Sequence, residues 1–287
     1  KCLVIGSGIS GIGAVALLEK YHADVVLYDS SDKLTKEDLE AKLPGESKAV
    51  CIAGELPEEG ELSIQAAVLS PGVPTDIPLV NRMRDRGVQI LGEIELGFLA
   101  EQGRVIAITG TNGKTTTTTL TGEIMKAHFG KDKTFVVGNI GNPYTLEADK
   151  TSKDSVTVGE ISSFQLETIH TFHPVVSAIL NITPDHLNRH HTMEAYVAAK
   201  ENITLNQTGQ DICVLNYENE YTRDFGGRCP ARVVYFSSAR PLENGYFLRG
   251  DKIVRAEAGK EEELLDIRRD MNLVGICNVE NVMAAIA

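Results

Sequence analysis

The sequence lacks the features that define disulfide-rich, zinc-ribbon and membrane-spanning proteins. Its five cysteines are scattered and no two form a C-x-x-C pair, which excludes a zinc ribbon and argues against a disulfide framework. No run of 18 apolar residues occurs, so no helix is expected to span a membrane. The apolar stretch 2–18 is interrupted by four glycines and two serines, so we do not expect a signal peptide. These absences favour a protein of the reducing cytoplasm.

Positive charge is also scarce. The 287 residues include 28 Lys and Arg against 40 Asp and Glu, which gives a formal net charge of −12. This balance argues against a protein whose main partner is a nucleic-acid backbone or an anionic membrane. It does not exclude phosphate ligands, because one loop at a helix N-terminus can hold a phosphate in an acidic protein. The length favours about two domains.

Strands and helices alternate along the chain. Short apolar runs predict strands over 2–5, 23–28, 66–69, 88–91, 105–108, 134–137, 156–159, 175–180, 211–215 and 231–236. Helical spacing predicts helices over 10–20, 79–86, 93–100, 113–128, 192–204 and 277–287. This alternation predicts an α/β fold with mostly parallel sheets covered by helices. The helix predicted at the C-terminus has no cap and the first residue is not Met, so we expect a fragment of a longer protein.

A first candidate site is the glycine-rich segment Gly6-Ser-Gly8-Ile-Ser-Gly11, which lies between a predicted strand and a predicted helix. Glycines allow a tight turn, and the helix N-terminus offers free N–H groups to a diphosphate. Asp29 ends the second strand, 18 residues after Gly11, where an acid that reads a ribose or a base would lie. The motif by itself leaves NAD, FAD and nucleotide-sugar ligands open.

A second candidate site is the segment 109–116, Thr-Gly-Thr-Asn-Gly-Lys-Thr-Thr. It follows a strand and opens a helix, and it matches the end of the phosphate loop, with Ile108 in place of the first glycine. Backbone N–H groups would hold phosphates, Lys114 would neutralise the β and γ oxygens, and the Thr115 hydroxyl would ligate Mg²⁺. Two nucleotide-type sites in separate domains indicate that ATP is spent on something bound by the first domain.

Other polar residues stand at predicted strand ends. Glu160 ends a buried strand, where an acid is costly unless it is paired or metal-bound. Asp185 and His186 follow the strand 175–180, at the edge where open sheets bind ligands. Taken alone, Asn139 is typical of a turn residue, and Lys200 on a predicted helix is typical of an exposed surface lysine.

Together these motifs resemble the Mur ligases of bacterial peptidoglycan synthesis, and among them the D-glutamate-adding type. The matching segments are 6–11, 70–72, 109–116, 138–141, 160–167, 181–189, 198–200 and 275–281. The resemblance implies a Rossmann-like domain over 1–92 that binds the UDP substrate, a P-loop ATPase-like central domain over 93–287, and a third, D-glutamate-binding domain absent from this chain. It implies an ATP-dependent ligase that adds D-glutamate to UDP-N-acetylmuramoyl-L-alanine through an acyl phosphate.

The resemblance also assigns residues to roles. Substrate-binding residues would be Ile9, Ser10, Asp29, Ser30, Ser70, Gly72, Asn139 and Ser162. ATP-binding residues would be Gly110, Thr111, Asn112, Gly113, Lys114, Thr115, Thr116, Asn278 and Asn281. Two Mg²⁺ ions would be held, one by Thr115 and Glu160 and the other by His186 and a carbamylated Lys200. The residues that take part in catalysis would be Lys114, Glu160, His186, Lys200 and Asn139.

Three other interpretations stay open. The chain could belong to another Mur ligase type, such as the L-alanine-adding one. It could be a nucleotide-binding module that is inactive without the third domain. The glycine-rich loop alone would also fit a nicotinamide oxidoreductase, although that interpretation leaves Lys114 without a role. We expect a monomer that binds neither nucleic acid nor membranes.

Overall fold

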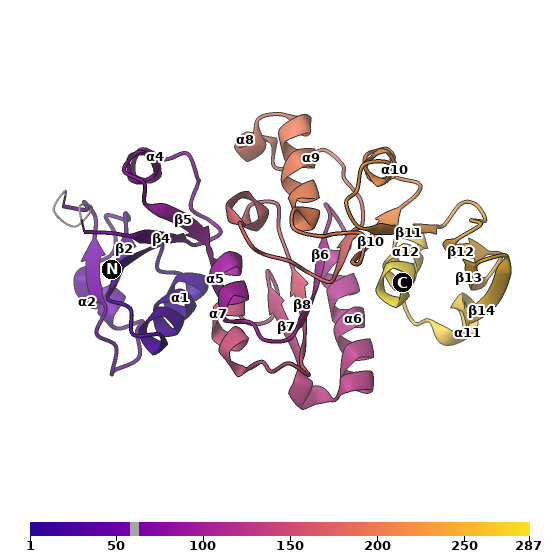
Figure 1. Ribbon diagram of the computed structural model, residues 1–287, viewed down its shortest axis with the longest axis horizontal. Coiled ribbons are helices and arrows are strands. Elements are labelled where there is room, and N and C mark those ends of the chain that lie inside the picture. The colour runs from indigo at the N-terminus through magenta and orange to yellow at the C-terminus, as the bar shows by residue number, and fades with distance from the viewer. Residues whose placement is uncertain (58–62) are drawn as a thin grey trace. The chain divides into compact units, whose positions relative to one another are not determined.

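The computed structural model describes residues 1–57 and 63–287, which form two compact units (Figure 1). Unit 1 contains residues 1–102, 141–152 and 164–172. Unit 2 contains residues 103–140, 153–163 and 173–287. Two segments from the middle of the chain therefore pack with unit 1. The domain border placed at residue 92 from the sequence stays a prediction.

Unit 1 is built on a five-stranded parallel sheet of order β3-β2-β1-β4-β5. Its strands are β1 (Cys2–Ile5), β2 (Val25–Asp29), β3 (Val50–Ala53), β4 (Ala66–Leu69) and β5 (Gln89–Gly92). Its helices are α1 (Ile9–Lys20), α2 (Lys36–Glu40), α4 (Pro78–Asp85), α5 (Glu93–Ala100) and α7 (Tyr144–Glu147), with 3-10 turns η2 (Ala148–Lys150) and η3 (Gln165–Thr168). This order matches five of the six strands of the Rossmann order 3-2-1-4-5-6, so the predicted Rossmann-like fold is confirmed.

Two buried carboxylates on α5 hold the inserted segments in unit 1. Glu95, 1% exposed, accepts hydrogen bonds from the backbone N–H groups of His170, Thr171 and Phe172 at 2.7–3.0 Å, and one from the Thr171 hydroxyl. Glu93 accepts from the N–H and the hydroxyl of Thr145, both at 2.8 Å. A buried carboxylate is stable only with such partners, so α5 binds segments that lie 52 to 77 residues away in sequence.

Unit 2 contains a nine-stranded sheet of order β14-β13-β12-β11-β10-β9-β6-β8-β7. Its strands are β6 (Arg104–Thr109), β7 (Thr134–Gly138), β8 (Val156–Glu160), β9 (Val176–Ile179), β10 (Ile212–Asn216), β11 (Arg232–Ser237), β12 (Gly245–Arg249), β13 (Lys252–Glu257) and β14 (Lys260–Asp266). Strands β6 to β12 all run parallel to one another. Strand β13 then pairs antiparallel with β12, and β14 pairs antiparallel with β13. The mostly parallel arrangement predicted from the sequence is confirmed.

Helices cover the unit 2 sheet. They are α6 (Lys114–Phe129), α8 (Leu187–His190), α9 (Met193–Glu201), α10 (Glu220–Gly226), α11 (Ile267–Asp270) and α12 (Ile276–Ile286), with 3-10 turns η1 (Lys131–Lys133) and η4 (Asn202–Thr204). Helix α12 packs beside α6, and its apolar face, which includes Val279 and Met283, joins the core formed by Ile108, Val158 and Val214. Within residues 1–57 and 63–287, no helix combines the length and apolar character needed to cross a membrane.

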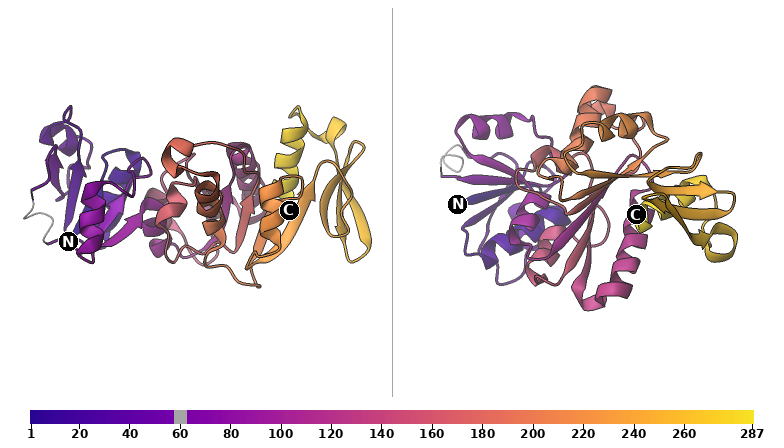
Figure 2. Two further views of the ribbon diagram at one scale, coloured as in Figure 1. Left: turned by 90° about the horizontal axis from the view of Figure 1, so that it is seen from above. Right: turned by 45° about the vertical axis from the view of Figure 1, so that its right-hand side comes forward.

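The antiparallel strands β12, β13 and β14 were not predicted from the sequence. They extend from one edge of the unit 2 sheet (Figure 2). The edge strand β14 reads Lys-Glu-Glu-Glu-Leu-Leu-Asp, which shows no apolar alternation because charge is typical of an exposed edge. A tight turn with positive φ at Ala258 (51°) and Gly259 (77°) joins β13 to β14, as the twist of a hairpin requires.

Candidate phosphate and nucleotide site

The predicted phosphate loop connects the end of β6 to the start of α6. Gly110 and Gly113 have φ values of 151° and 84°, a backbone region that disfavours other residues. A Cβ at Gly113 would lie 2.2 Å from Asn281 Oδ1, so a larger residue would strain the backbone at this φ and displace the Asn281 side chain. No side chain caps α6. The first-turn N–H groups, which lack intrahelical partners, and the positive end of the helix dipole are therefore available to an anion.

Asn181 fixes the tip of this loop. Its backbone oxygen accepts from the N–H of Thr111 at 2.9 Å, and its side chain bonds both the N–H and the oxygen of Asn112, at 2.8 and 3.0 Å. No role was predicted for Asn181 from the sequence, although it lies in a segment that matches the family. It follows β9, which pairs with β6. Parallel strands end at the same edge of a sheet, so this position could have predicted a contact with the loop after β6.

Two lysine ammonium groups converge on one carbonyl oxygen of the loop. Lys114 Nζ donates to Gly110 O at 3.0 Å and to Thr111 O at 2.9 Å, and Lys200 Nζ donates to the same Gly110 O at 2.8 Å. Lys200 is 2% exposed, so the surface position predicted from its sequence pattern alone is wrong. Burial and the charge of Lys114 lower the pKa of Lys200 to about 7, and burial lowers the pKa of Lys114.

A carboxylate, a hydroxyl and an amide meet beside these lysines. The Thr115 hydroxyl donates to Glu160 Oε2 at 2.9 Å, and Asn139 donates its side-chain amide to Glu160 Oε1 at 2.9 Å. Glu160 is 1% exposed at the carboxyl end of β8, and Ser162 follows two residues later. A hydroxyl and a carboxylate are oxygen donors of the kind Mg²⁺ prefers, with water completing its shell. The donor pair Thr115 and Glu160 therefore fits the ion.

The second predicted metal site is arranged around a tyrosine. His186 has a φ of 52°, and its ring packs edge-on against Tyr196 with centroids 6.3 Å apart. Tyr196 also lies beside Lys200, whose Nζ is 4.7 Å from the ring centroid. His186 and Lys200 thus contact the same ring. Across the described ranges, no group of three or more His, Cys, Asp or Glu side chains could hold a metal ion.

The asparagines predicted to lie near the adenine differ in position. Asn281 is buried against the first turn of α6, where its Oδ1 accepts from the Thr117 hydroxyl at 3.4 Å. Asn278 lies one turn earlier on α12 and donates to Val274 O at 2.8 Å. Of these two asparagines, Asn281 is therefore the one that forms a hydrogen bond with α6, the helix that follows the phosphate loop. Thr116 lies in the first turn of α6.

In unit 1 the glycine-rich loop packs tightly between β1 and α1. A Cβ at Gly11 would lie 1.9 Å from Gly6 O, and the Ser70 hydroxyl donates to that oxygen at 3.2 Å. The predicted residues Ser70 and Gly6 are therefore brought together. Gly72 follows two residues beyond Ser70, in the turn after β4. Ile9 and Ser10 open α1 behind an N-cap, Gly8, that makes no side-chain bond, and Ile9 is 73% exposed.

Asp29 is engaged by its own unit. Its carboxylate accepts from the N–H and hydroxyl of Ser7 at 3.0 and 2.6 Å and from the N–H of Ser31 at 3.0 Å. Partial burial opposes ionisation, but these bonds and the charge of Lys42 lower the pKa of Asp29. Lys42 Nζ donates to the Ser7 hydroxyl at 2.9 Å. Ser7 and Lys42 were missed by the sequence analysis. Ser30 follows Asp29 directly.

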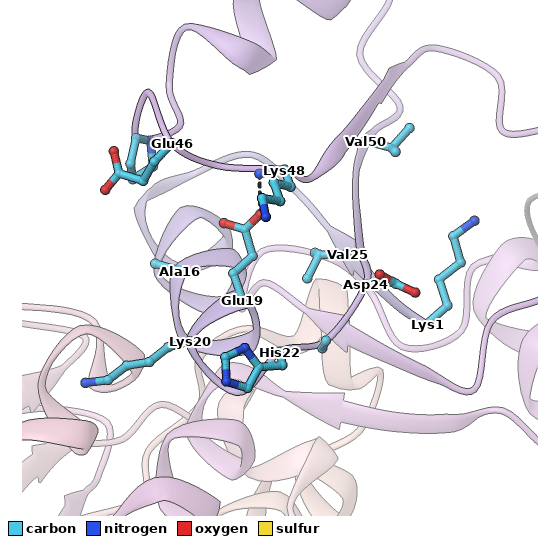
Figure 3. Close-up of a pocket in the computed structure, with 12 residues that line it drawn as sticks. Lys1, Ala16, Glu19, Lys20, His22, Asp24, Val25, Glu46, Lys48 and Val50 are labelled. Atoms are coloured by element: carbon cyan, nitrogen blue, oxygen red, sulfur yellow. Dashed lines mark hydrogen bonds between the residues drawn. The ribbon is translucent and has the colours of Figure 1, made fainter.

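The largest cavity described does not coincide with either predicted site. It has a volume of about 790 Å³ and lies at the amino end of β2, where Lys1, Glu19, Lys20 and His22 line it with mixed charge (Figure 3). Open parallel sheets bind ligands at the opposite, carboxyl edge. A smaller pocket does lie at that edge, beyond β4 and β5, and includes Ser70 and Glu93.

The site consists of a strand, a loop that carries glycines and a lysine, and a helix, with a hydroxyl–carboxylate pair beside the loop. This combination defines a nucleotide-binding protein of the P-loop class. Residues 108–287 match the family model of the Mur ligase middle domain, and residues 1–92 match that of the Mur ligase MurD-like N-terminal domain. The chain belongs to the Mur ligase family.

Several curated relatives share about half of their aligned residues with the chain. It is 54% identical over 285 residues to UDP-N-acetylmuramoylalanine–D-glutamate ligase of Lachnospira eligens, an alignment that covers 99% of the chain and 62% of the relative. It is 52% identical over 286 residues to the ligase of that name in Lachnoclostridium phytofermentans, with 100% and 62% covered. The chain thus spans about 62% of the length of these relatives.

Solved structures share the fold at low sequence identity. The UDP-N-acetylmuramate:L-alanyl-gamma-D-glutamyl-meso-diaminopimelate ligase of Neisseria meningitides matches with a TM-score of 0.61 at 16% identity and covers 99% of this chain and 91% of that one. UDP-N-acetylmuramate-alanine ligase of Thermotoga maritima matches with a TM-score of 0.55 at 22% identity and covers 100% and 64%. These likenesses concern the fold alone.

Proposed function

We propose that the protein to which this chain belongs is an ATP-dependent ligase that joins D-glutamate to UDP-N-acetylmuramoyl-L-alanine. The observation that carries the proposal is the convergence of Lys114 and Lys200 on Gly110 O, beside the Thr115–Glu160 pair. The charge of Lys114 and the free N–H groups at the start of α6 favour a polyphosphate, and the buried Lys200 beside them is the position of the proposed carbamate. The substrates are inferred from the names of relatives 52–54% identical to the chain.

Activation of the substrate requires phosphoryl transfer. The carboxylate of the UDP substrate would attack the γ-phosphorus of ATP, ADP would leave, and an acyl phosphate would form. Lys114 would release its loop carbonyls and bind the β and γ oxygens, where its charge offsets the charge that develops during transfer. Thr115 and Glu160 would hold Mg²⁺, which supplies charge neutralisation when bound. Asn139, fixed on Glu160, would orient the reacting carboxylate.

Amide formation completes the reaction. The neutral amine of D-glutamate would attack the acyl carbon and form a carbon–nitrogen bond. The carbon–oxygen bond to the phosphate would then break, inorganic phosphate would leave, and the amine would lose one proton to the departing phosphate or to solvent. The tetrahedral intermediate carries negative charge, which the positive loop stabilises.

Lys200 would serve as a carbamate that, with His186, holds a second Mg²⁺. Its burial and its proximity to Lys114 support this role, because both favour the neutral amine, which is the form that adds to CO₂. The addition forms a carbon–nitrogen bond and releases one proton, and it converts a cation into an anionic oxygen donor. Oxygen anions suit Mg²⁺, whereas an ammonium repels it.

In unit 1, the UDP substrate would lie at the carboxyl edge of the sheet. Ile9 and Ser10 would meet the diphosphate at the start of α1, and Asp29 and Ser30 would contact the uracil. Ser70 and Gly72 would line the same pocket. The bond from Ser7 to Asp29 would fix the carboxylate that reads the base.

The proposal is tested by binding to the chain itself, because the chain spans 62% of the relatives' length and binding at each site does not require turnover. Calorimetry should detect UDP-N-acetylmuramoyl-L-alanine and, separately, Mg-ATP. Lys114→Ala should abolish Mg-ATP binding and leave the UDP ligand unchanged, while Lys133→Ala, at an exposed lysine, should change neither. Preference for UDP-N-acetylmuramate would indicate the L-alanine-adding type, and binding of NADH alone would refute the ligase proposal.

A further inference from the structure

Tyr196 lies at the centre of the contacts that join the phosphate loop to helix α9. It is 1% exposed and stands one helical turn before Lys200. Lys200 Nζ is 4.7 Å from its ring centroid, and the His186 ring packs edge-on against it. Its hydroxyl lies 3.1 Å from Thr111 Oγ1 at the tip of the loop. One side chain therefore contacts the loop and two residues of the proposed metal site.

The Thr111 hydroxyl has partners on both Thr183 and Tyr196. Thr111 Oγ1 lies 3.2 Å from Thr183 O, to which it can donate, and accepts from Thr183 N at 3.0 Å. A hydroxyl has one proton and two acceptor positions, so when Thr111 donates to Thr183 O an acceptor position remains for the phenol of Tyr196. Phenylalanine would fill the same space but would leave Thr111 without this donor.

We propose that Tyr196 is a positioning residue for the nucleotide triphosphate: its phenol holds the loop tip at Thr111, and its ring sets Lys200 and His186 against the loop. The inference rests on the proposed ATP-dependent function and extends it to a residue that does not touch the nucleotide. Asn181 holds the backbone at Thr111 and Asn112, and Tyr196 holds the Thr111 hydroxyl, so the loop keeps the shape that leads into the free N–H groups at the start of α6. Preorganisation of this kind raises affinity because no ordering is needed on binding.

The first experiment removes one oxygen atom. In the chain as described, Tyr196→Phe should weaken binding of Mg-AMP-PNP by about three- to tenfold in calorimetry, the effect expected for one hydrogen bond. The matched control is Tyr221→Phe, which removes the same atom from a tyrosine 39% exposed on α10 and should leave the affinity unchanged. Tyr196→Leu, which also removes the ring from Lys200, should weaken binding further.

A double-mutant cycle separates positioning from a merely structural role. Thr111→Val removes the other partner of the same bond. If the bond carries the effect, Tyr196→Phe in the Thr111→Val background should change the Kd for Mg-AMP-PNP by less than about twofold, because the interaction is already lost. A structural contribution would lower the melting temperature of each variant but would leave their nucleotide affinities equal to that of the wild type.

The outcomes distinguish the two proposals. A wild-type Kd in Tyr196→Phe, or full additivity in the cycle, overturns the role of Tyr196 while the ATP site stands. Failure of the wild-type chain to bind Mg-AMP-PNP overturns the proposed function and this inference with it. Binding of UDP-N-acetylmuramoyl-L-alanine, measured in every variant, should stay unchanged, and its loss would show that the substitution has damaged the fold.

Discussion

Replacement of Lys200 by methionine should stabilise unit 2 at low pH and lose that advantage as the pH rises. Methionine keeps the length and the apolar stem of lysine but removes the buried ammonium. Gly110 O, which accepts the Lys200 proton, still accepts from Lys114 in the variant. The substitution therefore removes a charge without leaving a buried acceptor unpaired.

The size of the effect follows from the pKa of Lys200, which is about 7 in the folded chain against an ordinary lysine value of 10.5. Between these values the unfolded chain binds more protons than the folded one, so the stability of the wild type rises with pH. Each pKa unit corresponds to about 1.4 kcal/mol. From pH 6 to pH 9 the advantage of Lys200→Met over the wild type should shrink by about 2–3 kcal/mol.

Urea unfolding followed by circular dichroism measures this difference, because the chain has no tryptophan. Buffers are kept free of CO₂ so that the lysine stays unmodified. Lys133→Met, at a lysine whose side chain is 51% exposed, is the control and should show a small difference that does not depend on pH. A difference for Lys200→Met that is constant between pH 6 and 9 would refute the buried-ammonium reasoning.

Three further predictions address other parts of the chain. Glu95→Ala should destabilise unit 1 by about 3–5 kcal/mol in urea unfolding, since three backbone N–H groups lose their acceptor, whereas Glu95→Gln should cost about half as much. Gly113→Ala should weaken Mg-ATP binding at least about tenfold in calorimetry, because a Cβ meets Asn281 at 2.2 Å; wild-type affinity would contradict the loop geometry. Added bicarbonate should raise the melting temperature of the wild type but not of Lys200→Met, and equal shifts would argue against carbamate formation.

Features encoded in contiguous stretches were predicted correctly from the sequence. The strand–loop–helix around Gly6 spans residues 2–20 and the one around Lys114 spans residues 104–129, so local periodicity and glycine spacing reveal them. The parallel sheets follow from the alternation of these units. The antiparallel strands β12 to β14 were missed because β14 is an edge strand rich in glutamate, and its sequence lacks the alternation that indicates a strand.

Features that depend on distant residues were not predictable in this way. Lys200 resembles a surface lysine until α9 is packed against the phosphate loop, 90 residues away in sequence. Tyr196 and Lys200 are four residues apart, so they lie on one face of the helix. A buried face for the tyrosine could therefore have predicted burial of the lysine as well. Asn181 and Ser7 have the same explanation: each side chain gains its role only when the sheet brings strand ends together.

The electrostatics of unit 2 give a physical reason for a lysine at position 200. Two ammonium groups that share one buried acceptor repel each other, and Lys114 contributes to the low pKa of Lys200 for this reason. Carbamate formation would replace the inner cation with an anion, so the repulsion between the two side chains would become an attraction, and Mg²⁺ would gain an oxygen donor. A glutamate there would supply a permanent anion of shorter reach. A buried lysine that is half neutral near pH 7 instead combines the length needed to reach Gly110 with access to the negative form through CO₂.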